Sequence, residues 1–90
     1  MARHLFTVED AFTIRGRGLI LVPGIVPEGD ERFRVGDRIS LRKPDGSSTD
    51  AQIGGLELFA SYALGKIPVI LIAMKKEDVP IGTEVWSSDG

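Results

Sequence analysis

A chain of 90 residues, of which 42% are hydrophobic and 27% charged, has the composition of one small globular domain and is too short for two. Its formal net charge of −2 excludes a broad electrostatic grip on nucleic acid or anionic lipid, and the absence of cysteine excludes disulfides. The longest apolar run, 67–74, is far shorter than the roughly 20 residues that span a membrane. We therefore expect a single domain over 1–90, cytoplasmic and without a membrane partner.

The first predicted element is a strand over residues 5–14. Apolar residues recur at every second position, so we expect Phe6, Val8 and Phe12 to share its inward face. In a regular strand Asp10 would share that face, and burying an unpaired carboxylate is costly. The sequence therefore predicts either a bulge at Glu9-Asp10 or hydrogen bonds to Asp10 from a turn or an arginine.

The run RGRG at 15–18 interrupts this apolar pattern. Its glycines allow the chain to reverse tightly and present Arg17 at the tip of a turn. We therefore expect a hairpin that joins the first strand to extended pieces between 19 and 26, broken at Pro23.

The rest of the chain predicts further short strands separated by turns. Residues 38–43 alternate, with Ile39 and Leu41 facing inward, and Pro44-Asp45-Gly46 is typical of a reverse turn. The other expected elements are a bend at Gly54-Gly55, a helix or loop at 60–66, a strand at 67–74, a charged turn at 75–78 and a strand at 83–87. Together they predict an all-β fold, a small closed antiparallel barrel of about six to eight strands.

No combination of side chains in the sequence is typical of a catalytic or metal site. His4 is the only histidine, so neither a zinc site nor a serine–histidine triad has its ligands or its base. No serine lies in a G-x-S-x-G motif, and no phosphate-binding P-loop is present. We predict that the chain is not an enzyme, holds no metal or cofactor and binds no GTP itself.

Four motifs carry a resemblance to a known family. Residues 9–18, EDAFTIRGRG, resemble the opening of the second domain of translational GTPases, above all elongation factor Tu. FRVGDRI at 33–39, GLELF at 55–59 and KKEDVPIG at 75–82 follow in the family's order. The resemblance covers residues 6–86 and implies the small β-barrel of that domain, without the family's GTPase domain.

The resemblance also implies an RNA-, tRNA- or ribosome-associated surface. In elongation factor Tu the second domain helps to hold the aminoacylated 3′ end of tRNA. The residues that match this region, with a neighbouring arginine of the turn, are Glu9, Asp10, Phe12, Arg15 and Arg17. All seven arginines lie within the first 42 residues, which permits a local basic patch. Arginines gathered beside Phe12 would favour RNA, and scattered arginines would favour a protein partner.

The alternative is a protein-interaction or self-associating module. Lys66 and Ile72 stand where the family has an asparagine and an arginine, and the strand at 67–74 is apolar on both faces. A barrel strand needs only one inward face, so the other is expected to be exposed and to bind a second copy or another protein. The predicted interface residues are Ile67, Val69, Ile70 and Ile72. Alternatively, the segment 60–66 folds over this strand.

Overall fold

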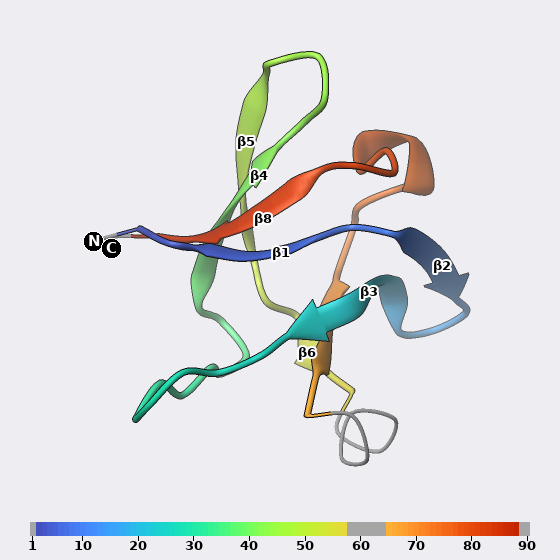
Figure 1. Cartoon of the computed structure of the whole chain (residues 1–90). Helices are drawn as coiled ribbons and strands as arrows, with labels where there is room; N and C mark the ends of the chain where they lie inside the picture. Colours follow the sequence, from blue (N-terminus) through green and yellow to red (C-terminus); the bar gives the residue numbers. More distant parts are fainter. Residues whose placement is uncertain (1, 58–64, 89–90) are drawn as a thin grey trace.

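The computed structural model describes residues 2–57 and 65–88, and these form an all-β domain of antiparallel strands (Figure 1). The first sheet contains, in order, β1 (His4–Thr7), β8 (Glu84–Ser87), β4 (Arg38–Arg42) and β5 (Ser48–Gln52). The second sheet contains β2 (Asp10–Ile14), β3 (Gly18–Ile25), β7 (Ile67–Leu71) and β6 (Gly55–Leu56). The only helical element in the described chain is the 3-10 turn η1 (Lys76–Asp78). The predicted all-β antiparallel fold is confirmed.

Two continuous segments carry the chain from the first sheet to the second. Between β1 and β2, the Val8 amide donates to Thr83 O at 2.8 Å and the next amide, that of Glu9, donates to Val22 O at 2.9 Å. The two sheets therefore meet at a corner where consecutive residues bond to different sheets.

The second corner lies between β5 and β6. Here the Ile53 amide donates to Asp37 O at 2.8 Å, and the Gly54 amide donates to Ile70 O at 2.8 Å. In the part of the chain that the structure describes, the strand ladders make two sheets joined at these corners, and no single closed ladder is recorded.

The hydrophobic core lies between the two sheets and draws on both. On β4, Ile39 and Leu41 are buried as the alternation predicted, and their neighbours along the strand are not. The buried core residues are Leu5, Phe6, Val8, Ala11, Leu19, Leu21, Ile25, Ile39, Leu41, Ile53, Val69, Leu71, Val79 and Val85. Each sheet thus covers its apolar face with the other, as antiparallel sheets commonly do.

The predicted inward position of Phe12 is wrong. Phe6 and Val8 are buried, but Ala11 is the next buried residue and Phe12 is 50% exposed. The corner at Val8 and Glu9 shifts the alternation by one residue, so that β2 turns its other set of side chains to the core. Asp10 is consequently only half-buried, and its Oδ1 accepts a hydrogen bond from the Ala11 amide at 2.8 Å.

The predicted hairpin is confirmed, since residues 15–17 form the turn between β2 and β3. Gly18 is required at its end: its φ is +124°, and a Cβ there would lie 2.5 Å from Leu71 O. The predicted break at Pro23 is wrong, because β3 continues to Ile25. The irregularity appears instead as a shift in the β3–β7 register between Leu21 and Ile25.

The strand expected at 67–74 is shorter in the structure. β7 ends at Leu71, because residues 72 and 73 form a turn in which Ala73 has a φ of 64°. Residues 58–64 lie outside the described residues, so the predictions for the helix or loop at 60–66 and for Leu58 and Phe59 stay untested.

The first and last described segments lie side by side (Figure 1). The Ser87 amide donates to Arg3 O at 2.8 Å, and the Arg3 amide donates to Ser87 Oγ at 2.8 Å. Over residues 2–57 and 65–88, no helix has the length and apolar character needed to cross a membrane.

Candidate functional site

The residues predicted to contact RNA follow one strand and its turn. Glu9 lies exposed at the first corner, Asp10 and Phe12 lie on the outward face of β2, and Arg15 and Arg17 are exposed in the hairpin turn. The structure therefore brings an exposed aromatic ring and two arginines onto the same hairpin. They extend along its length and do not converge on a hollow.

Carboxylates neutralise one cation of this hairpin and one cation beside it. Arg17 Nη1 lies 2.8 Å from Glu57 Oε2, and Lys76 Nζ lies 4.0 Å from Asp10 Oδ1. Both pairs are partly exposed, so each contributes little to stability, but each lowers the positive charge available to a phosphate.

The remaining arginines are scattered over the domain. Arg3 holds Glu31 in a two-point contact, with Nε 2.8 Å from Oε2 and Nη2 2.5 Å from Oε1. These hydrogen bonds, with one from the Glu28 amide, lower the pKa of Glu31 to about 2, and the same pairing raises the pKa of Arg3. Arg42 lies over the Trp86 ring of the first sheet, 3.9 Å from the ring centroid. The described arginines therefore form no single basic patch beside Phe12.

The protein interface predicted on β7 is corrected by the burial of its residues. Val69 and Ile70 are 0% and 2% exposed and Ile67 is half-buried, so only Ile72 is open to a partner. The reason is that Val69 faces inward and belongs to the hydrophobic core. The outward residue Ile70 of β7 packs closely over Gly55, where an added Cβ would lie 3.2 Å from Ile70 Cδ1.

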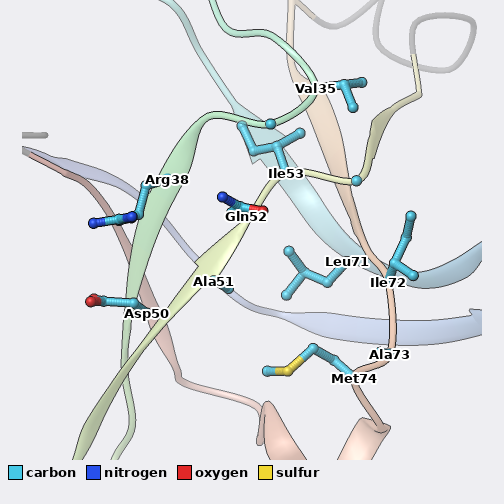
Figure 2. Close-up of a pocket in the computed structure, with 12 residues that line it drawn as sticks. Val35, Arg38, Asp50, Ala51, Gln52, Ile53, Leu71, Ile72, Ala73 and Met74 are labelled. Carbon is cyan, nitrogen blue, oxygen red and sulfur yellow. The ribbon is translucent and has the colours of Figure 1, made fainter.

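An open groove of about 810 Å³ lies beside β5 (Figure 2). Val35 and Ile72 stand at its sides and are each 65% exposed, while the core residues Leu71 and Ile53 reach it from below. Its lining residues are Val35, Gly36, Arg38, Asp50, Ala51, Gln52, Ile53, Gly54, Leu71, Ile72, Ala73 and Met74. The groove is thus apolar along the 71–74 side and polar along β5.

Sequence reasoning missed this groove because three separate segments build it. The turn at Val35, the strand β5 and residues 71–74 are far apart in the chain and meet only after folding. The available signals were the apolar Ile72 and the glycine at position 54, which leaves room for Ile72 beside β5.

The described residues offer no constellation for metal binding. In residues 2–57 and 65–88, no three side chains of histidine, aspartate or glutamate converge to hold an ion. His4 Nε2 lies 2.9 Å from Thr7 Oγ1, and its ring contacts the edge of Trp86 at 5.6 Å between centroids. These contacts give His4 a place in the packing of the first sheet.

The fold and these surfaces define a small all-β antiparallel domain of two four-stranded sheets. Comparison of the chain with protein-family models, with curated proteins and with solved structures finds no match. The relation to translational GTPases therefore stays a prediction that rests on the four motifs.

Proposed function

We propose that the chain is a non-catalytic binding module that holds a protein partner in the groove between β5 and residues 71–74. The observation that carries the proposal is the convergence of Val35 and Ile72, each 65% exposed, on one hollow of about 810 Å³. Single exposed aliphatic residues are ordinary on protein surfaces, whereas exposed aliphatics that share a concave site are typical of binding surfaces.

The polar side of the groove supports a protein partner. Arg38, Asp50 and Gln52 border the apolar residues, which is the arrangement of a protein interface with a polar rim. The scatter of the arginines points the same way, because a nucleic-acid surface needs cations gathered on one face.

The proposal can be tested by selecting short random peptides displayed on phage against the immobilised domain. Selected peptides are expected to shift the amide NMR signals of Val35, Ile53 and Met74. Ile72→Glu is expected to abolish binding, because a carboxylate replaces the apolar side of the groove. Ile81→Glu is the matched control, since Ile81 is 64% exposed and lies outside the groove. Peptides that bind Ile72→Glu as well as the original chain would refute the groove.

We also propose that the two sheets form one small barrel of the elongation factor Tu domain 2 type. Both corner segments support it. The segment β1–β2 pairs with β8 in the first sheet and with β3 in the second, and the segment β5–β6 pairs with β4 in the first sheet and with β7 in the second. If each is counted as one bent strand, every strand has a neighbour on both sides along part of its length, which is the strand order of a barrel. Slow hydrogen exchange at the Val8, Glu9, Ile53 and Gly54 amides is the expected result, and rapid exchange at either corner would argue against closure.

A second candidate function is RNA binding at the β2–β3 hairpin. Phe12 is 50% exposed, and an aromatic ring near arginines can stack a base while the cations contact phosphates. Titration with a hairpin RNA ending in 3′-CCA, free and aminoacylated, would shift the signals of residues 9–17, and the shifts would weaken with salt. Phe12→Ala would remove most of the binding, and unchanged spectra at low salt would exclude this function.

A further inference from the structure

We infer that the occupant of the groove is an extended segment of another protein, which adds to the free edge of β5 as an antiparallel strand and carries a basic residue between two apolar residues. The inference rests on the proposed function and specifies the binding mode and the chemistry of the partner. Addition of a strand to an exposed sheet edge is a common way to bind peptides.

The hydrogen bonds of the β4–β5 hairpin show which backbone groups of β5 are unpaired. The Ile53 amide bonds to Asp37 O and the Lys43 amide bonds to Ser47 O, each at 2.8 Å. Hydrogen-bonded pairs alternate along an antiparallel ladder, so Thr49 and Ala51 exchange the intervening bonds with β4. The residues of β5 that alternate with these bonded positions are Ser48, Asp50 and Gln52. Their N–H and C=O groups point away from β4.

This free edge borders the groove. In the described chain β5 pairs only with β4, so no strand covers its other side. Residues 50–54 form one side of the groove and residues 71–74 the other, and the side chains of Leu71 and Met74 point into the space between them (Figure 2). An added strand would therefore satisfy the outward backbone groups of β5 and lie in the groove at the same time.

The alternation of inward and outward side chains along β5 indicates which residues of the added strand are apolar. In a paired strand, side chains opposite one another share a face of the sheet. Ala51 lies on the inward face and lines the groove near Leu71. The partner residues opposite Thr49 and Ala51 therefore point toward the apolar side of the groove, where branched aliphatic side chains fit.

Asp50 indicates the charge of the partner residue that lies between the two apolar partner residues. Its side chain is exposed and lies opposite Ser40, and no cationic side chain within residues 2–57 and 65–88 forms an ion pair with it. A lysine or arginine opposite Asp50 is favoured. A second copy of this chain fits poorly, because antiparallel self-pairing over all of β5 would place the two Asp50 carboxylates opposite each other.

The probe for this mode is the acetylated and amidated heptapeptide Ser-Thr-Val-Lys-Val-Thr-Ser with a fluorescent label, followed by anisotropy. In the proposed register the lysine N–H points to β5, and the valine N–H groups point away from it. N-methylation of the lysine nitrogen is expected to weaken binding about tenfold or more, whereas N-methylation of either valine is expected to change it about twofold or less. Equal effects of the two methylations would overturn strand addition.

Two variants of the domain complete the test. Gln52→Pro removes an outward N–H without removing a bond to β4, and proline is tolerated at such edge positions. It is expected to abolish binding, with an unchanged core NMR spectrum as the control for folding. Asp50→Lys is expected to reverse the preference, so that a peptide with glutamate in place of lysine binds better.

The outcomes separate this inference from the proposed function. If Ile72→Glu abolishes binding while Gln52→Pro and the lysine N-methyl group do not, the groove binds its partner in another way and strand addition is wrong. If the heptapeptide does not bind but phage-selected peptides occupy the groove and are not extended, the inference again fails and the function stands. If no peptide occupies the groove, both fail.

Discussion

The two sheets differ in how far the side chains on their outward faces are exposed. In the second sheet, Ile20 of β3 and Ile70 of β7 face away from the core and are still only 7% and 2% exposed. In the first sheet, the outward residues of β5 alternate with half-buried ones and are exposed. A strand that is apolar on both faces therefore marks packing within this chain, while the proposed opening for a partner lies at the polar free edge of β5.

The two sheets also differ in the room around their glycines. At Gly24 an added Cβ would lie 2.5 Å from the carbonyl carbon of Ile67, so β3 and β7 approach more closely than any side chain permits. At Gly46, in the turn between β4 and β5, nothing lies within 4 Å. The second sheet depends on close backbone contact, whereas the hairpin of the first sheet depends only on a permitted backbone conformation.

The largest effect is expected from Gly24→Ala. The added methyl group collides with β7 backbone at a φ of +121°, and overpacking with backbone strain costs about 2–6 kcal/mol. Gly46→Ala is the control, since it meets only the strain of a φ of +91°, about 1–2 kcal/mol. Urea unfolding measures both, and equal losses would show that the close contact of β3 and β7 does not matter.

Leu71→Ala is expected to cost about 2–5 kcal/mol, because Leu71 is 1% exposed and its truncation leaves a cavity. Its neighbour Ile72 is 65% exposed, so Ile72→Ala is expected to cost about 0.5 kcal/mol or less. Thermal unfolding of the two variants compares the core with the side of the groove. A large loss in Ile72→Ala would place Ile72 in the core and weaken its assignment to a binding surface.

Arg42→Ala tests the outward face of the first sheet. Arg42 lies 3.9 Å from the Trp86 ring centroid, and such a contact contributes about 0.5–1 kcal/mol. Trp86 is the only tryptophan, so its emission is expected to shift together with the small loss of stability. Arg38→Ala, on the same face of β4, is the control and is expected to leave the emission unchanged.

The smallest effect is expected from Glu31, because its pair with Arg3 is partly exposed. Its folded pKa of about 2 lies below the ordinary value of 4.5, so its contribution is complete above pH 4.5 and is lost as the pH falls toward 2. Glu31→Gln is expected to flatten the dependence of unfolding free energy on pH in that window. The exposed Glu77 provides the control variant Glu77→Gln, which should keep the slope. An unchanged slope in Glu31→Gln would show that Arg3 does not hold this carboxylate in solution.

Local chemistry made part of the fold predictable. The hairpin turn within residues 15–18 and the alternation of Ile39 and Leu41 depend on neighbouring residues, and the structure confirms them. The sequence left a bulge at Glu9-Asp10 open, but it did not decide the exposure of Phe12, because the corner that shifts the alternation is fixed by bonds to the distant Thr83 and Val22.

The candidate site was less accessible to sequence reasoning. The burial of Ile70 depends on Gly55 of β6, and the groove depends on the meeting of Val35 with Ile72, contacts that no local pattern contains. The hairpin residues from Glu9 to Arg17 lie together because they are adjacent in the chain, and their binding of RNA stays a prediction. Their pairing with Glu57 and Lys76 again required the folded structure.

The bonds between Arg3 and Ser87 have a consequence for protein engineering. Because these residues lie side by side, a short linker could join them and the chain could be reopened in the turn at 44–46 (Figure 1). Such a circular permutant would keep every strand neighbour while moving its new ends to the tip of the β4–β5 hairpin. A tag or reporter could then be fused at the strand whose free edge borders the groove, so that occupancy of the groove becomes a signal that can be read directly.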